Sequence, residues 1–305
     1  MSNEVTKEQI KANVYKLYYQ LIVGKKQAGS IDANIERFQK LLNDTREIYK
    51  NGFAEKLDVD KVEVQLNNLK TEKEKIDNQL EVGNAALKFL INLPQKDTLL
   101  LTDSLDEKQI NAVNLSDSFD FKNRKEYQQL NTALKLNKYN IKRYQLSRIP
   151  TLAAFGSYSK NAQRNDFTFF DKGDWFTTAL VGVKLSIPIF DGGARSARIQ
   201  KAKYELQKVK NSMERLEEAI QLDINSSKLK LESAMKTLEN QKKNVELAEK
   251  VYNSTKFKYE QGLGSNMEIY NAQTELKVAQ NNYYGALYDA IIAKIDFQKA
   301  TGTLQ

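Results

Sequence analysis

The 305-residue sequence contains no cysteine and no histidine. This absence excludes a cysteine nucleophile, a histidine general base and a zinc site built from the usual ligands. A chain without cysteine suits an oxidising compartment where no disulfide is needed, but cytosolic proteins can also lack cysteine. The sequence has no glycine-rich phosphate loop and no pocket signal, so it predicts no enzyme, no cofactor and no metal site.

Proline is scarce, with three residues at Pro94, Pro150 and Pro188. Because proline breaks helix interiors, such spacing indicates long uninterrupted helices. No run of about 18 apolar residues occurs, so no transmembrane helix is predicted. Residues 1–10 are polar and indicate the start of a helix rather than a signal peptide.

The charge is basic overall, with a formal net charge of +8. Lysine is dispersed along the predicted helices and interleaved with Glu and Asp, as on a solvated helix exterior. No groove-reading module accompanies the lysines, so nucleic acid is not a predicted partner.

Apolar residues recur in steps of three and four through most of the chain, the pattern of coiled-coil helices. The first helix is predicted over residues 10–49, with Gly24 and Gly29 loosening its middle. Another is predicted over residues 122–147. The longest covers residues 194–261 without Pro or Gly, a rod on the order of 100 Å. We call the positions that recur in these steps the seam of a helix, the stripe expected to face the neighbouring helix. In the second helix the seam comprises Val62, Leu66, Leu69, Lys73, Ile76, Leu80, Gly83, Leu87 and Leu90.

Two stretches, residues 151–159 and 175–190, are strand-like because they are rich in aromatic, β-branched and small residues. In the second, odd positions from Ala179 to Ile189 are apolar and most even positions are small or polar. This alternation is typical of a transmembrane β-strand. A soluble hairpin docked on helices is the alternative. Aromatic residues near the ends of the connecting loop suggest a membrane interface: Phe167, Phe169, Phe170, Trp175 and Phe176.

A repeat is the most informative feature. Residues 49–59 align with residues 259–269 in the pattern Y-x-x-G-x-x-x-x-φ-[DE]-φ, where φ is apolar. The glycines, Gly52 and Gly262, suit a left-handed C-cap, and the acids, Asp58 and Glu268, suit the first turn of the next helix. The repeat therefore predicts two equivalent helix–turn–helix hairpins.

These residues resemble the TolC-like outer-membrane efflux proteins over nearly the whole chain. The resemblance is carried by the two tip motifs and by residues 186–193, which are similar to the family's strand-to-helix junction. It implies a mainly α fold of long coiled-coil hairpins with one β-hairpin in a transmembrane β-barrel. The junction residues are Pro188, Asp191, Gly192 and Gly193.

The resemblance also implies a passive conduit in the outer membrane, with a long periplasmic extension, serving tripartite efflux or type I secretion. The protein would be a homotrimer in outer-membrane lipid, docked on a periplasmic adaptor (membrane fusion) protein and an inner-membrane pump or ABC transporter. A soluble coiled-coil structural or interaction protein is the alternative. The implied domains are residues 1–94 (first periplasmic hairpin), 95–121 (connecting segment), 122–150 (helix), 151–190 (β-barrel hairpin) and 191–305 (second hairpin).

The resemblance also implies residue roles at the periplasmic end. Asp58 and Tyr259 match an inner-gate pair, and Glu268 and Asn271 match constriction-lining acids. Gly264 stands where a basic gate partner can occur, and Asn271 replaces a possible second acid, so Glu268 alone would form the charged ring. The residues matched to adaptor-facing tips are Tyr49, Gly52, Phe53, Gly262 and Leu263.

The family carries an export signal and a first β-hairpin ahead of the segment that begins this sequence. One hairpin is present where two are expected. From the sequence we therefore expect a fragment, or a chain whose first strands have been removed.

Overall fold

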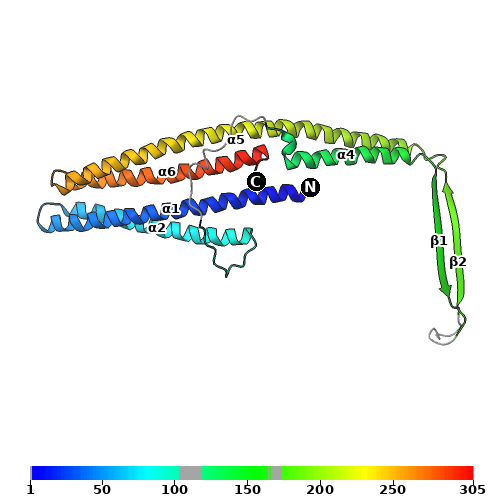
Figure 1. The fold of residues 1–305 in the computed structure, drawn as a ribbon, viewed down its shortest axis with the longest axis horizontal. Helices are drawn as coiled ribbons and strands as arrows, with labels where there is room; N and C mark the ends of the chain where they lie inside the picture. The colour runs from blue at the N-terminus through cyan, green and yellow to red at the C-terminus, as the bar shows by residue number, and fades with distance from the viewer. Residues whose placement is uncertain (1, 103–118, 164, 166–172, 305) are drawn as a thin grey trace. The chain divides into compact units, whose positions relative to one another are not determined.

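A computed structural model of the chain describes residues 2–102, 119–163, 165 and 173–304 (Figure 1). The predicted loop aromatics Phe167, Phe169 and Phe170, and residues 103–118 of the predicted connecting segment, lie outside the described residues. The elements, in chain order, are α1 (Ser2–Lys50), α2 (Lys56–Leu90), the 3₁₀ turn η1 (Phe121–Asn123), α4 (Lys125–Leu146), β1 (Thr151–Asn161), β2 (Phe176–Ser186), α5 (Ala194–Glu260) and α6 (Asn266–Thr301).

The chain divides into two compact units. The first contains residues 1–128 and 217–305, and the second contains residues 129–216. In the first unit, α1 and α2 form one helical hairpin while α5 and α6 form another (Figure 1). Helix α1 packs against both α2 and α6, so the two hairpins share one core.

The predicted seams form that core. In α2, the buried residues include Val62, Leu66, Leu69 and Ile76, all of them seam positions. Each fully buried aliphatic side chain contributes about 1.5–3 kcal/mol relative to exposure. In the part of α5 that belongs to the first unit, the buried residues follow the predicted steps of three and four: Ile220, Ile224, Ser227, Leu231, Leu238 and Tyr252.

The prediction for α1 was wrong in two respects. The helix begins at Ser2 rather than near Ile10, and Ile10 is exposed while Ala12 is buried. Gly24 and Gly29 do not interrupt the helix. A Cβ at Gly24 would lie 3.0 Å from Cδ2 of Leu80, so this glycine lets α2 approach closely.

Gly83 of α2 has the complementary role. A Cβ there would lie 2.7 Å from Cδ2 of Leu21 on α1. The two glycines therefore each accept a leucine of the opposite helix, which explains why glycine occupies a seam position whose usual residue is larger.

In the second unit, β1 and β2 form a two-stranded antiparallel hairpin. The register runs from Thr151 opposite Ser186 to Asn161 opposite Phe176. The apolar odd positions of β2 face Leu152, Ala154, Gly156 and Tyr158 of β1. Both strands thus present one continuous apolar face.

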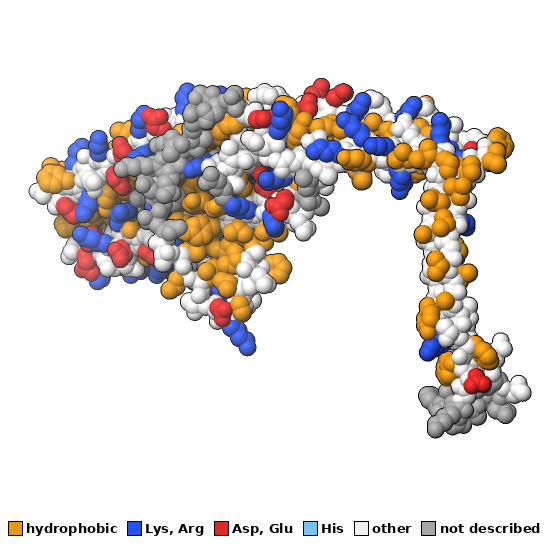
Figure 2. Space-filling model, turned by 45° about the vertical axis from the view of Figure 1, so that its right-hand side comes forward, with side chains coloured by type: hydrophobic (Ala, Val, Ile, Leu, Met, Phe, Trp, Pro, Cys, Tyr) orange, Lys and Arg blue, Asp and Glu red, His pale blue; other side chains and the backbone are white. Residues whose placement is uncertain are grey.

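None of the hairpin's described residues is buried within the chain. Val181 is 86% exposed, and hydrophobic side chains run along the hairpin in Figure 2. On the other face, the Phe155 ring covers Gly182, where a Cβ would lie 2.6 Å from the ring. An apolar face of this extent marks a surface that requires a lipid or protein environment.

Across the part of the chain that the structure describes, no helix has an apolar stretch long enough to cross a bilayer.

Candidate functional site

The two helical tips share one backbone geometry. Helix α1 ends at Lys50 and α5 ends at Glu260, positions that are equivalent in the repeat. Gly52 has φ 79° and Gly262 has φ 72°, both in the left-handed region. These φ values confirm the predicted glycine C-caps. Any residue with a Cβ would adopt this conformation at a cost of about 1–2 kcal/mol.

The capping hydrogen bonds also match. The Gly52 amide donates to the Tyr49 carbonyl over 2.9 Å, and the Gly262 amide donates to the Tyr259 carbonyl over 3.0 Å. The next amides, of Phe53 and Leu263, donate to carbonyls five residues earlier over 3.0 and 2.9 Å. Both turns are therefore Schellman motifs.

The acids also occupy equivalent positions, since Asp58 and Glu268 are each the third residue of the helix that follows. The capping before them differs. Ser265 accepts a hydrogen bond from the Glu268 amide over 3.2 Å, whereas Glu55 makes no side-chain cap on α2. The second tip is therefore the better capped one.

The tips end in exposed apolar side chains. Phe53 is 85% exposed and Leu263 is 81% exposed. Gly264 differs from its equivalent Ala54 because a Cβ there would lie 3.1 Å from the Tyr259 backbone nitrogen. A larger side chain at position 264 would therefore require the Tyr259 backbone to shift by a few tenths of an ångström.

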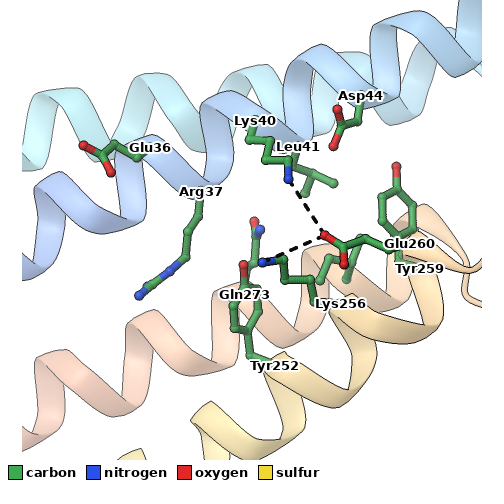
Figure 3. Close-up of a pocket in the computed structure, with 11 residues that line it drawn as sticks. Glu36, Arg37, Lys40, Leu41, Asp44, Tyr252, Lys256, Tyr259, Glu260 and Gln273 are labelled. Carbon is green, nitrogen blue, oxygen red and sulfur yellow. Dashed lines mark ion pairs between the residues drawn. The ribbon is translucent and has the colours of Figure 1, made fainter.

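The equivalent tyrosines have different surroundings. Tyr49 is 44% exposed, whereas the Tyr259 hydroxyl is buried and makes no hydrogen bond of normal geometry. Figure 3 shows Tyr259 pointing from α5 towards α1 at Asp44. Burial, together with the charge of Asp44, raises the pKa of Tyr259. The tyrosine therefore stays neutral and joins the second tip to α1.

Thr45 of α1 lies beside this tyrosine and is fully buried. Its Oγ1 is 2.7 Å from the Leu41 carbonyl and 2.9 Å from Oδ1 of Asn266, the first residue of α6. Tyr259 and Asn266 thus both contact the same turn of α1, from opposite sides of the α5–α6 turn.

The other predicted gate and constriction residues lie at the starts of their helices. Asp58 is half-buried at the start of α2, and Glu268 and Asn271 are exposed one turn apart on α6. The structure brings Tyr259 together with Asp44 and Thr45, so the pairing of Tyr259 with Asp58 stays a prediction.

A cavity of about 250 Å³ lies between α1, α5 and α6 next to Tyr259 (Figure 3). At its rim, Glu260 lies 3.8 Å from Lys40 and 3.9 Å from Lys256. Arg37 stacks over the Tyr252 ring at 5.5 Å. The lining residues are Glu36, Arg37, Lys40, Leu41, Asp44, Tyr252, Lys256, Tyr259, Glu260, Ile269 and Gln273.

Further along α6, polar contacts continue to join the hairpins. Lys277 lies 2.7 Å from Glu72 of α2, and both side chains are largely buried. Gln280 accepts hydrogen bonds from Ser30 and Asn34 of α1, over 3.0 and 2.9 Å. Polar pairs in a helical core fix the register of the helices.

An arginine anchors the far end of the second hairpin. The Arg124 side chain is 10% exposed and lies 3.1 Å from Glu126 and 3.0 Å from Asp223 of α5. It also donates to the Ala300 carbonyl at the end of α6 over 2.9 Å. Burial alone would raise the pKa of Glu126, but the hydrogen bond from Arg124, a backbone hydrogen bond and the charges of Arg124 and Lys299 together outweigh burial and hold that pKa low.

The junction residues begin α5. Asp191 accepts hydrogen bonds from the Gly193 amide over 3.2 Å and the Arg195 amide over 2.8 Å. Gly192 and Gly193 have φ 62° and 84°. Pro188 follows the end of β2. Asp191 therefore caps the N-terminus of α5. The two glycines allow the tight turn that precedes this helix.

Sequence reasoning assigned no role to Ser265, Thr45, Gln273 or Arg124. Ser265 had a readable signal, because Ser-x-x-Glu before an apolar run is the capping-box pattern. Thr45 and Arg124 are buried polar residues whose partners Asn266 and Ala300 lie far away in the sequence. Gln273 is also buried, but its Oε1 has no hydrogen-bond partner. Among the described residues, no group of three or more acidic side chains could hold a metal ion.

Comparison with known proteins agrees with this architecture. Residues 121–303 match the family described as outer membrane efflux protein. The outer membrane protein TolC of Vibrio cholerae is 19% identical, with 98% of this chain and 69% of that protein covered.

Two solved structures share the fold. The outer membrane protein VceC of Vibrio cholerae has a TM-score of 0.74 at 15% identity, covering 98% of this chain and 71% of that one. The outer-membrane channel OprN has a TM-score of 0.76 at 13% identity, covering 98% and 67%.

Proposed function

Because this chain belongs to the outer membrane efflux protein family and is thus an outer-membrane efflux channel component, we propose that it acts as a passive conduit. Substrates would cross the periplasm and outer membrane through it, in tripartite efflux or type I secretion, with no chemistry on the way. The family is one of efflux proteins and not of enzymes. Membership of this family also supports a role within a multi-component efflux complex.

The repeated tip is the observation that most supports a conduit. Two hairpins with the same Schellman turn end in exposed apolar residues, Phe53 and Leu263. Repeated, equivalent elements suit the wall of a tube, in which each hairpin meets similar neighbours. We propose that both tips, including Tyr49, Gly52 and Gly262, contact a periplasmic adaptor protein, and that an inner-membrane pump or ABC transporter completes the complex.

A homotrimer accounts for the β-hairpin. Its apolar face is exposed in the chain, and edge strands are not tolerated in lipid unless they pair. A twelve-stranded barrel in outer-membrane lipid would take four strands from each of three protomers, and β1 and β2 would be two of those four. Residues 151–190 would contribute to the barrel, residues 1–94 and 191–305 to the periplasmic α-barrel, and residues 95–121 and 122–150 to the connection between them.

The gate is proposed at the second tip. The half-buried Tyr259 points its buried hydroxyl towards α1, and Asn266 contacts Thr45 of the same turn. Opening would draw the α5–α6 tip away from α1, and Asp58 would assist closure from the start of α2. Adaptor binding would favour the open packing, a population shift between two arrangements of the hairpins.

Charge at the constriction would come from Glu268. Three copies in a trimer would form one carboxylate ring, which favours cations in a narrow passage. Asn271, one turn further, would line the same passage without adding charge.

The test exploits the repeat. In planar bilayers, Tyr259→Ala, which removes the ring that packs against α1, should raise the closed-state conductance several-fold, whereas the matched variant Tyr49→Ala should leave it unchanged. Asp58→Asn should act in the same direction as Tyr259→Ala. Equal effects of both tyrosine variants, or no effect of Tyr259→Ala and Asp58→Asn, would remove these residues from the gate.

A further inference from the structure

The cavity between α1, α5 and α6 is lined by Gln273, whose buried Oε1 has no hydrogen-bond partner among the described residues. Gln273 is 4% exposed, and Figure 3 shows its amide pointing from α6 towards α1. Buried polar groups in native proteins are almost always hydrogen-bonded, so an unpaired amide oxygen beside a cavity points to a missing partner.

The Gln273 amide limits what that partner can be. A primary amide presents an acceptor oxygen next to a donor nitrogen. The complementary group therefore has a donor next to an acceptor, as in a lactam. Such an edge pairs with the amide whichever way its oxygen and nitrogen are placed.

The walls of the cavity indicate the rest of the ligand. Leu41, Tyr252 and Ile269 are all at least nine-tenths buried and supply apolar surface. The charged lining consists of three cations and three anions, so it favours no net charge on the ligand. The volume of about 250 Å³ is small for a ligand site, which limits the occupant to one or two rings.

We propose that this cavity binds a small uncharged heterocycle whose N–H donor and neighbouring acceptor pair with the Gln273 amide. The ring lies among Leu41, Tyr252 and Ile269. The alternative occupant is ordered water, since the volume would hold about eight molecules at roughly 30 Å³ each. The proposal concerns binding alone and does not depend on the channel function.

The test compares two probes that differ in one donor. Binding of 6-fluoro-2-quinolinone and of its N-methyl derivative to the full chain is measured by ¹⁹F NMR line broadening. The N-methyl compound should bind about tenfold more weakly, because it leaves the buried amide oxygen without a donor.

Two variants locate the effect. In Gln273→Met, which keeps the side-chain shape, the two probes should bind equally. In Gln221→Leu, a control at an exposed glutamine of α5, the difference should persist. The two-probe comparison on the unaltered chain stands even if Gln273→Met fails to fold.

Three results would overturn the proposal. Equal binding of both probes to the unaltered chain would show that the ligand does not pair with the Gln273 amide. A difference that survives Gln273→Met would place the probe elsewhere. No binding of either probe would leave water as the occupant.

Discussion

The two helical tips are nearly identical in backbone and clearly different in surroundings. Each ends a helix at an equivalent residue, reverses at a left-handed glycine and starts the next helix with an acid at its third position. Only the second has a serine cap and a tyrosine whose buried hydroxyl points towards another helix. Local sequence therefore determines the turn, whereas long-range packing determines which tip is joined to α1.

The largest expected effect tests whether the second hairpin is the more firmly anchored one. Arg124→Leu should lower the free energy of unfolding by about 2 kcal/mol, because it leaves the buried Ala300 carbonyl without its donor and removes the ion pairs with two partly exposed carboxylates. Urea denaturation measures the change. The matched variant is Arg46→Leu, whose pair with Glu63 joins α1 and α2 and is 43% and 45% exposed. It should cost less than about 1 kcal/mol. Equal losses would contradict the comparison.

The next test asks whether the two turns are energetically equivalent. Gly52→Ala and Gly262→Ala should each lower stability by about 1–2 kcal/mol, because both glycines have a left-handed φ. No atom lies within 4 Å of either added Cβ, so no clash complicates the result. Thermal unfolding of both variants checks this. A large difference between them would show that the turns are not equivalent.

A smaller loss of stability should distinguish the N-cap of α6 from that of α2. Ser265→Ala should cost about 1 kcal/mol, because the Glu268 amide loses its acceptor. Glu55→Ala, at the equivalent position of the first tip, should change stability little since Glu55 makes no cap. Hydrogen exchange of the first-turn amides of α2 and α6 would locate the loss. Faster exchange in both helices would argue against the assigned difference.

The smallest effect depends on pH. Since the pKa of Glu126 is lowered in the folded chain, its ionised form stabilises the fold above its ordinary pKa. That contribution disappears as the pH falls through the lowered pKa. The stability difference between the unaltered chain and Glu126→Gln should therefore be largest near neutral pH and shrink in acid. A difference independent of pH would mean that the charge on Glu126 does not matter.

Sequence alone predicted the features that depend on neighbouring residues. The α5 seam, the Schellman glycines and the strand alternation all arise from periods of a few residues, and the structure confirms them. Even Ser265 could have been found from its capping-box spacing. The family resemblance followed from the same local motifs.

Long-range contacts could not be predicted in this way. Thr45 meets Asn266 across 221 positions, and Arg124 meets Ala300 across 176. Nothing in the local sequence distinguishes Tyr259 from Tyr49, yet Tyr259 is half-buried and Tyr49 is exposed. The error at Gly24 has the same origin, because the leucine that fills the space above it belongs to α2.

The uninterrupted register of β1 and β2 limits how such a chain can change in length. All eleven pairs join residues whose numbers have opposite parity, so deleting one residue from a strand would exchange its two faces. Deleting two would preserve them. In the coiled-coil part, the corresponding increment is seven residues. Homologues should therefore vary in strand length by twos and in helix length by heptads, a pattern that selection on membrane thickness and periplasmic width would leave in their alignments.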